Sequence, residues 1–469
     1  MSTPTRTRSR LADGALVLAA LVITVLFAGA DKPLWIDEFL HFAMAGMNLA
    51  DALHTIWATT SGDGVNWGQT GAYFLLDYAL GSVFGASTIA LRMPSILAAF
   101  ALLMSAVMFL RLNGLSRWYQ GLVLMAFAGQ GSIMYYAGEA RPYMPMASFA
   151  VASLVYYRFP LDRRRTWLAR CFGIYGVVIG SVFHPYYVLF LPIVLGFSFW
   201  RARRDGSTEL TRSDVVRFAQ PTLVIPGLAL FIAVGALTWM KSRTNMDYDT
   251  LEYAGSLSGL AHDFFSTHLP IVFLLGSFTA SFVPPTLEWF APELLTAPLF
   301  LLVLTVLPLA RPRWRPALTP PVVLLWLGLG TTVALSLMSY WQHYWILARQ
   351  WLGGIAFATI AIVWFLGELA GVATRENSRF WQGLVIAFVG VLIAVSTVVV
   401  AGRAQRLLSW NQAWSQFEND QRTRQELVDA TMQNGDWVYL GNMNVVRGGP
   451  VWPEVAQYYG VTRTPTVTP

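Results

Sequence analysis

Long apolar runs separated by short polar segments follow one another along most of the chain. The first run, Gly14–Ala30, has 17 residues and comes after three arginines within the first ten positions. Crossing a bilayer takes about 20 apolar residues in a helix, so this run and those that follow predict about 11 to 13 transmembrane helices. The later runs lie at 69–91, 93–110, 118–138, 142–157, 171–200, 218–240, 269–287, 294–310, 317–341, 344–367 and 380–401.

Two stretches predict something other than a plain crossing helix. In 171–200 the dipeptide His184-Pro185 interrupts the run, which indicates two short helices that meet at depth in the membrane. In Phe39–Trp57, apolar residues recur at helical spacing with polar residues between them, His41 included. This pattern is typical of an interfacial helix in the first large loop.

Two polar segments complete the predicted organisation. Lys241–His268 is long and contains acids, and we expect it to form a second large loop with another interfacial helix. The segment 402–469 is the only soluble stretch of any size, with a predicted helix at Trp414–Met432 and a strand at Asp436–Leu440. The chain is thus predicted to be an all-α polytopic membrane protein, with a transmembrane domain at 1–401 and a small soluble C-terminal α/β appendage at 402–469.

The composition agrees with a membrane protein. Hydrophobic residues make up 55% of the chain and charged residues only 12%, whereas about a quarter of the residues of a soluble protein are charged. The net charge of +6 comes from arginine clusters, which suit cytoplasmic loops and anionic lipid rather than nucleic acid. The single cysteine, Cys171, lies in an apolar run, so neither a disulfide framework nor a cluster of thiol metal ligands is expected.

The arginines also predict an orientation. Those before the first run place the N-terminus in the cytoplasm, and Asp37 and Glu38 on the other side of the membrane. We prefer an uncleaved anchor to the alternative of a signal peptide, for which 17 apolar residues are slightly long. Counting from this helix does not place Arg111 and Arg117 on the cytoplasmic side. Further predicted cytoplasmic clusters lie at 158–170, 201–217, 311–315 and 375–379.

Two adjacent acids, Asp37 and Glu38, follow the first membrane exit by a few residues. Carboxylates at this depth can take a proton from a hydroxyl, hold a cation, or be solvated by water and headgroups. Acids that flank membrane helices are common, so the solvated state is favoured on residue type alone. The interfacial helix predicted just after them favours a site at this place.

The segment Tyr135–Tyr143 (YYAGEARPY) is a second candidate. It sets Glu139 and Arg141 two residues apart beside Tyr135 and Tyr136, so a sugar or a phosphate would find donors and acceptors there. The alternative is a salt bridge at a helix end with interfacial tyrosines.

Several other polar residues lie within mostly apolar segments, namely Arg92, His184 and the pair Arg349-Gln350. Ionisable groups inside a membrane are costly, and they usually serve an ion, a substrate or a lipid headgroup. Together these residues predict a polar cavity.

These segments, in this order, also resemble a known family. The chain has IDE after the first helix, then FGASTIALRMPSILAA, then YYAGEARPYMPMASFAVASLVYY, then a helix with a histidine. This order is similar to that of the polyprenyl-phosphate-sugar-dependent glycosyltransferases of the C-type membrane fold, which include protein O-mannosyltransferases and lipid A aminoarabinose transferases. The similarity covers roughly the first 200 residues, and beyond them only hydropathy and an ARQW stretch remain.

The resemblance implies a bacterial inner-membrane enzyme that moves a sugar from a polyprenyl-phosphate carrier to a lipid, glycan or protein acceptor on the periplasmic face. It implies Asp37 as the base and Glu38 as the residue that orients it. The predicted substrate contacts are Glu139, Arg141, Tyr135, Tyr136, His184 and His41, and the predicted contacts to the lipid phosphate are Arg349, Arg92 and Lys241.

The chain departs from the family in one place. Many relatives have a His-Pro-Pro-Leu or Lys-Pro-Pro-Leu element before the second helix, where this chain has NWGQTGAY (Asn66–Tyr73). Gln69 or Asn66 would have to make that contact without a charge.

No cofactor is predicted. A divalent metal held by Asp37 and Glu139 is chemically feasible, but the family implies none. The main alternative function is a lipid or small-solute transporter or flippase, which would also use intramembrane charges and a broken helix. A non-catalytic scaffold is a third.

Overall fold

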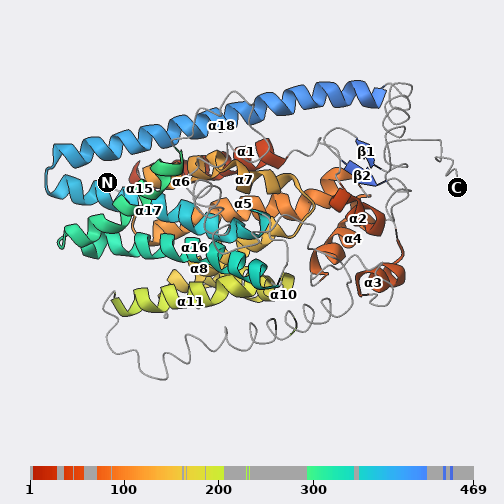
Figure 1. Cartoon of the computed structure of the whole chain (residues 1–469), viewed down its shortest axis with the longest axis horizontal. Helices are drawn as coiled ribbons and strands as arrows, with labels where there is room; N and C mark the ends of the chain where they lie inside the picture. Colours follow the sequence, from red (N-terminus) through yellow and green to blue (C-terminus); the bar gives the residue numbers. More distant parts are fainter. Residues whose placement is uncertain are drawn as a thin grey trace.

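The protein is an elongated helical bundle (Figure 1). The structure, a computed structural model, describes residues 4–28, 36–45, 47–57, 71–85, 87–160, 163–164, 166–184, 186–204, 229, 232, 293–342, 348–419, 437–439 and 444–446. The long helix α18 (Arg379–Asn419) runs along one side of the bundle, and the short helices α2 (Ile36–Ala45), α3 (Leu49–Trp57) and α4 (Ala72–Phe84) gather at one end.

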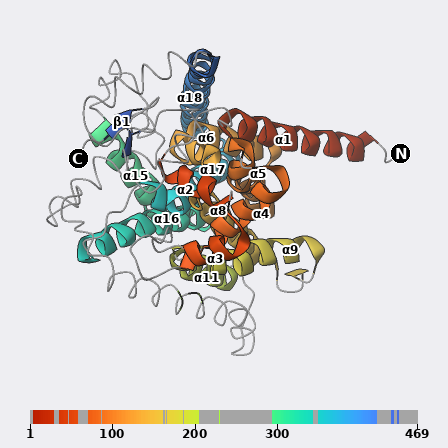
Figure 2. The same ribbon diagram turned by 90° about the vertical axis from the view of Figure 1, so that its right-hand side faces the viewer.

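Large apolar side chains cover the outside of this bundle. Helix α1 (Pro4–Ala28) exposes 61% of Leu18 and 65% of Val25, and α18 exposes 71% of Ile386 and 60% of Val391. Viewed along the bundle, α1 leans outward toward its N-terminus, where it is least packed (Figure 2). Apolar surface on this scale is costly in water but suits lipid.

Five helices in the described part of the chain are long and apolar enough to cross a membrane. The chain is therefore an all-α membrane protein in its main part. The predicted total of 11 to 13 spans includes segments outside the description, and it stays a prediction. The five segments are Leu11–Ala28, Thr88–Leu112, Arg315–Leu335, Leu352–Arg375 and Arg379–Gln405.

The prediction of a span at 69–91 is wrong. This segment folds into α4, whose 13 residues reach only about 20 Å, whereas the hydrocarbon core is about 30 Å thick. The chain then turns at Gly85, which has a φ of 77°, and Ser87 caps the next helix by accepting the N–H of Ala90. That helix, α5 (Thr88–Leu112), is the true second crossing.

Without a span at 69–91, the count of crossings places Arg111 and Arg117 on the same side of the membrane as the N-terminus. Because α4 is too short to cross, α5 is the next helix of crossing length after α1, and it returns directly to the end of the bundle from which α1 starts. There Nη2 of Arg111 lies 2.6 Å from Oδ1 of Asp13, and Nη2 of Arg117 lies 3.4 Å from the same atom. Both arginines are therefore at the N-terminal end of α1.

The next helices are shorter than the five candidate spans. Helices α6 (Arg117–Gly129), α7 (Gly131–Tyr135) and η1 (Tyr136–Gly138) run in succession where one span, 118–138, is predicted, and α8 (Tyr143–Arg158) matches the run 142–157.

The predicted break at His184 is confirmed. A short helix, α9 (Trp167–Phe172), leads through the π-helical turns of η3 (Gly173–Ile179) into α10 (Gly180–Phe183), and α11 (Tyr187–Arg204) begins after His184.

The C-terminal half contributes α15 (Glu293–Ala310), α16 (Arg315–Gln342), η8 (Ala348–Trp351) and α17 (Leu352–Arg375) before α18. Helices α16 and α17 pack closely because Gly328 and Gly354 face each other, so that a Cβ on either would meet the other's carbonyl oxygen at 2.6 Å. The ARQW stretch forms η8, which packs against α7.

Arginines from several helices lie together at one end of the bundle. Arg158 donates to Oδ1 of Asn113 beside Arg111, and Arg204 donates to the carbonyl of Arg315. We call this end the arginine-rich end, and the opposite end, with α2, α3 and α4, the site end. Apart from Arg92, Arg141 and Arg349, the cations of the described helices fall mainly at the arginine-rich end, as the positive-inside rule predicts for the cytoplasmic side.

The C-terminal segment is described only in part. Helix α18 continues through residue 402 to Asn419, so the predicted domain boundary lies inside a helix. The predicted strand is confirmed as β1 (Trp437–Tyr439), which pairs antiparallel with β2 (Asn444–Val446). The rest of the predicted appendage, the loop Lys241–His268 and the spans predicted at 218–240 and 269–287 lie outside the described residues.

Candidate functional site

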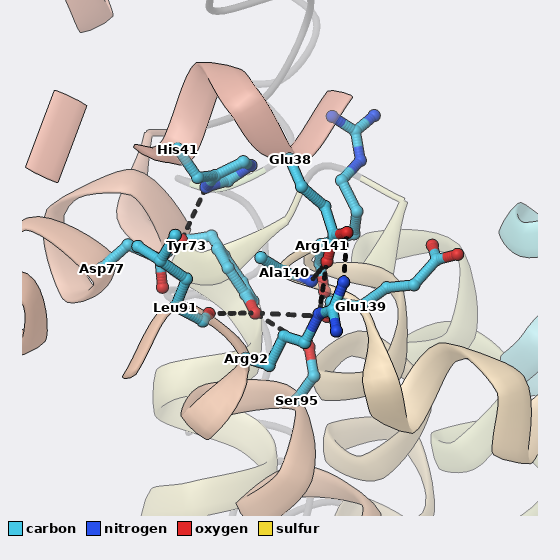
Figure 3. A network of polar contacts seen from close by, with 10 residues as sticks. All are labelled: Glu38, His41, Tyr73, Asp77, Leu91, Arg92, Ser95, Glu139, Ala140 and Arg141. Carbon is cyan, nitrogen blue, oxygen red and sulfur yellow. Dashed lines mark hydrogen bonds and ion pairs between the residues drawn. The ribbon is translucent and has the colours of Figure 1, made fainter. Parts of the chain in front are cut away.

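A buried ion pair joins the three motifs that the sequence analysis singles out. Nε of Arg92 in α5 donates to Oε1 of Glu38 in α2 at 2.8 Å, and Nη2 donates to Oε2 at 2.6 Å. The backbone N–H of Ala140 also donates to Oε1, at 2.7 Å (Figure 3). Both charged side chains are fully buried. This two-pronged geometry is the strongest form of an arginine–carboxylate pair, and it fixes α2 against α5 and the segment before α8.

A second set of hydrogen bonds, made by Tyr73 and Ser95, supports the same junction. The hydroxyl of Tyr73 in α4 lies 2.8 Å from Oγ of Ser95, and it is also 3.3 Å from the carbonyl oxygen of Leu91. Oγ of Ser95 lies 3.0 Å from the carbonyl oxygen of Arg141, to which it donates. Helix α4 is therefore joined to α5 and to the Glu139–Arg141 turn through polar groups that are buried.

Beside this junction lies a buried pair of a histidine and an acid. Nδ1 of His41 is 2.6 Å from Oδ2 of Asp77, and neither side chain is exposed. The imidazole stacks on the ring of Phe74, with 4.0 Å between centroids, and meets Tyr73 edge-on at 5.2 Å. Nε2 of His41 and Oδ1 of Asp77 have no hydrogen-bond partner in the part of the chain that the structure describes. They can serve a hydroxyl or a water.

The Glu139–Arg141 turn carries two charged side chains, which lie on another side of the junction. The side chains of Glu139 and Arg141 extend away from the Glu38–Arg92 pair and from each other (Figure 3). Tyr135 hydrogen-bonds to Glu139. The guanidinium of Arg141 lies 5.6 Å from the ring centroid of Tyr143, which is within the range of a cation–π contact.

His184 joins this side from the break between α10 and α11. Its ring centroid is 5.7 Å from that of Tyr143, and its Nδ1 accepts the backbone N–H of Tyr186. In α2, outside the membrane-spanning segments, burial and then the positive charge of Arg141 lower the pKa of His41. The His41 imidazole is therefore neutral at physiological pH and can donate or accept hydrogen bonds.

The structure brings together eight of the eleven predicted site residues. They come from α2, α5, α7, η1, the turn before α8 and the end of α10, and they are Glu38, His41, Arg92, Tyr135, Tyr136, Glu139, Arg141 and His184. Asp37 adjoins Glu38 in α2 and Arg349 lies in η8 next to α7, but the side chains of both lie outside the description, as does Lys241 entirely. Their roles stay predictions.

The geometry indicates that Arg92 and Glu38 position other parts of the site rather than contact a phosphate. A guanidinium that is occupied by a carboxylate on two nitrogens is poorly placed to hold a phosphate. The predicted phosphate contact of Arg92 stays a prediction, but its observed role is to hold Glu38. Glu38 in turn holds the backbone of Ala140.

Three residues of the junction, Tyr73, Asp77 and Ser95, are absent from the sequence predictions. Asp77 carries a usable signal, because it is the one acid in the run 69–91 and acids in apolar runs usually have a function. Tyr73 and Ser95 carry none, since a tyrosine or a serine in an apolar helix is common. Among the described residues, no group of three or more histidine, cysteine or acidic side chains could hold a metal ion.

Comparison with known proteins adds no relative: no family model, no curated protein and no solved structure matches this chain. The fold is that of an all-α membrane protein with a buried polar junction at the end opposite the arginine-rich end.

Proposed function

We propose that this protein is a membrane glycosyltransferase that moves a sugar from a polyprenyl-phosphate carrier to a cell-envelope acceptor outside the cytoplasm. The observation that carries the proposal is the Glu38–Arg92–Ala140 contact. It joins, in space, three of the four sequence segments on which the resemblance to this enzyme family rests. A chance likeness of three short motifs gives no reason for them to meet at one buried point.

The reaction needs a base on one side of the sugar and cations or donors on the other. An acceptor hydroxyl attacks the anomeric carbon, the bond from that carbon to the carrier phosphate breaks, and the hydroxyl proton passes to Asp37. Polyprenyl phosphate then leaves. The predicted phosphate contacts, Arg349 and Lys241, would stabilise the charge that develops on the leaving group.

The described residues suit the remaining tasks. Glu38 and Arg92 hold α2, and with it the neighbouring position of Asp37, against the bundle. The side chains of His41, Glu139 and Arg141 offer donors and acceptors of the kind that sugar hydroxyls require.

The test is transfer by the full-length protein in proteoliposomes, with a panel of radiolabelled polyprenyl-phosphate sugars and an extract of envelope acceptors. Asp37→Asn keeps the volume of the side chain but cannot take the proton, so we expect turnover to fall by about 10²–10⁴-fold. Binding of the donor lipid should change much less, because the carboxylate acts on the acceptor.

The matched control is Asp51→Asn, the same change at an exposed acid of α3, which should leave transfer unaltered. Near-normal transfer by Asp37→Asn would overturn the assignment and make Glu139 the next carboxylate to test. Movement of a labelled lipid across the bilayer, with no new glycosidic bond, would replace the enzyme with the transporter.

A further inference from the structure

The proposed transfer gives no task to Asp77, the buried acid of α4. Its Oδ2 lies 2.6 Å from Nδ1 of His41 in α2, and neither side chain is exposed. A charged N–H···O contact is usually about 2.7–2.9 Å long. A nitrogen and a carboxylate oxygen repel each other at such a short distance unless a proton lies between them, so the pair shares a proton.

Close packing of α2 on α4 holds the two side chains together. Ala45 lies one turn after His41, and Gly81 lies one turn after Asp77. A Cβ added to Gly81 would lie 2.7 Å from the Cβ of Ala45, so only glycine lets the two helices come this close. The imidazole also stacks on the ring of Phe74, with 4.0 Å between centroids. The pair is therefore held rigidly against an apolar wall.

The second nitrogen of the His41 ring is directed into the site. The two nitrogens of an imidazole point in nearly opposite directions, so Nε2 points away from Asp77, on the side where Glu38 lies (Figure 3). Among the described residues, neither Nε2 of His41 nor Oδ1 of Asp77 has a hydrogen-bond partner. Most buried polar atoms are hydrogen-bonded, and those that are not commonly serve catalysis or hold a water.

The charges around the pair favour a proton on Asp77. Glu38 of α2 is paired with Arg92 of α5, and the positive charge of Arg141 acts on His41. In α4, which does not cross the membrane, burial and then the negative charge of Glu38 raise the pKa of the Asp77 carboxyl well above its ordinary value. The pair therefore takes up a second proton at a higher pH than an ordinary carboxylate does.

The other ionisable groups on the helices around the pair are engaged elsewhere or exposed. The hydroxyl of Tyr73 in α4 lies 2.8 Å from Oγ of Ser95. Asp51 and His54 of α3 are exposed, and the side chain of Glu139 extends away from the junction (Figure 3).

We propose that His41 and Asp77 form a proton relay for the sugar transfer, in which His41 takes over the proton that Asp37 receives from the acceptor hydroxyl. Asp77 acts through His41, as a positioning residue that holds the shared proton. This inference rests on the proposed function. Asp37 precedes His41 by one helical turn, so their two positions lie on the same face of α2.

The transfer of the proton leaves no separated charge within the pair. The proton from Asp37 bonds to Nε2 of His41, and the shared proton moves from Nδ1 to Oδ2 of Asp77. Asp37 is then a carboxylate again and can take the proton of the next acceptor, while His41 and Asp77 are both neutral. The pair gives up its extra proton to water after the products leave.

The experiment is sugar transfer by the full-length protein in proteoliposomes, with kcat and KM measured across the pH range. Asp77→Asn keeps the size of the side chain, and its amide can still contact the His41 ring, but it cannot take the shared proton. We expect kcat to fall by roughly 10²-fold, the lower limit for a positioned proton-transfer group, with the KM for the donor lipid unaltered. The acid limb of the kcat profile should move to lower pH, because burial lowers the pKa of a His41 that has lost its carboxylate. A purely structural Asp77 would leave that limb in place.

Chemical rescue tests His41 itself. His41→Ala removes the relay and leaves a space of about the size of an imidazole, so kcat should fall by a similar factor and free imidazole should restore part of it. The matched control is His54→Ala, the same change at an exposed histidine of α3, which should neither lose activity nor respond to imidazole. Thermal unfolding of each variant in detergent verifies that it is folded.

Solid-state NMR of protein labelled with ¹⁵N-histidine detects the shared proton without any substrate. Wild-type protein should show a strongly downfield proton bonded to a histidine nitrogen. The signal should disappear in both His41→Ala and Asp77→Asn and remain in His54→Ala.

The outcomes separate this inference from the proposed function. Transfer by the wild type, together with an unaltered pH profile in Asp77→Asn or no rescue of His41→Ala by imidazole, would overturn the relay and leave the proposed function in place. A wild type without the downfield proton would overturn the relay as well. Absence of transfer with every donor would overturn the proposed function and the relay with it.

Discussion

At the scale of residues, the central feature is that the charges of the site junction are satisfied inside the protein. Arg92 and Glu38 are both fully buried, and the two hydrogen bonds between them are joined by one from the N–H of Ala140. Such a pair contributes little net stability compared with apolar residues, but breaking it is expensive because one charge is left alone. The Glu38–Arg92 pair therefore serves to fix the position of α2 against the bundle.

The first prediction concerns this pair. Glu38→Gln removes the carboxylate that pairs with the buried guanidinium of Arg92, so the free energy of unfolding should fall by about 3–5 kcal/mol. Adding Arg92→Met should restore part of the loss, because the buried cation is then removed. The measurement is thermal unfolding in detergent, with Asp51→Asn, a change at an exposed acid of α3, as control. If the loss in free energy of unfolding of the double variant equals the sum of the losses of the two single variants, the predicted coupling between Glu38 and Arg92 is contradicted.

The second prediction follows from the buried histidine of α2. Burial, and then the positive charge of Arg141, lowers the pKa of His41 in the folded protein well below its ordinary value of 6.5, so the unfolded state binds the proton more readily. Stability should therefore be complete above about pH 6.5 and fall as the pH drops below it, by at most about 1.4 kcal/mol per pH unit.

Unfolding temperatures between pH 8 and pH 5 measure this effect. His41→Gln should have a flatter profile than the wild type below about pH 6.5, because one of the groups that takes up a proton on unfolding is gone. His54→Gln, at an exposed histidine of α3, should leave the profile unaltered. Identical slopes for wild type and His41→Gln would refute the prediction.

At the scale of elements, close approach of backbones positions the site. Gly138, the last residue of η1, lies against the carbonyl oxygen of Ala28 at the end of α1, and a Cβ added there would overlap it. Only glycine lets these two backbones meet, and the next residues along the chain are those of the Glu139–Arg141 turn. The end of α1 therefore fixes the position of the Glu139–Arg141 turn.

The third prediction is that Gly138→Ala displaces this turn. The overlap is with backbone, which cannot rotate away, so we expect a loss of about 1–3 kcal/mol in stability and a loss of transfer activity. The control is Gly390→Ala in α18, where a Cβ meets nothing within 4 Å; there the better helix propensity should raise stability by up to about 1 kcal/mol. Equal effects of the two changes would argue against the close contact.

At the scale of the whole molecule, the two ends of the bundle differ in charge and in chemistry (Figure 1). The arginine-rich end has Arg111, Arg158 and Arg204, and the site end has the buried junction beneath α2, α3 and α4. By the positive-inside rule we expect the first to face the cytoplasm. The proposed transfer would then take place on the other side.

The last prediction tests that orientation with single cysteines in a Cys171→Ser background. Asp51→Cys, at an exposed position of the site end, should react with an impermeant maleimide in intact cells. Arg379→Cys, exposed at the arginine-rich end, should react only after the cells are permeabilised. The predicted loop at residue 250 should behave like Asp51→Cys. The reverse pattern would invert the topology and rule out a site outside the cytoplasm.

The sequence alone determined the membrane class, the break at His184, the strand at Trp437–Tyr439 and eight residues that the structure brings together at the site end. These depend on local quantities, namely the apolar length of a run, a proline, or a charge within an apolar segment, and each can be read without knowing its neighbours.

Only the tertiary structure decided that α4 does not cross and that Arg92 holds Glu38. It also brought Asp77 to His41. The physical reason is that a partner for a buried charge can lie anywhere along the chain. Glu38 and Arg92 are 54 positions apart, and the energy that pairs them depends on a distance in space that local patterns do not contain.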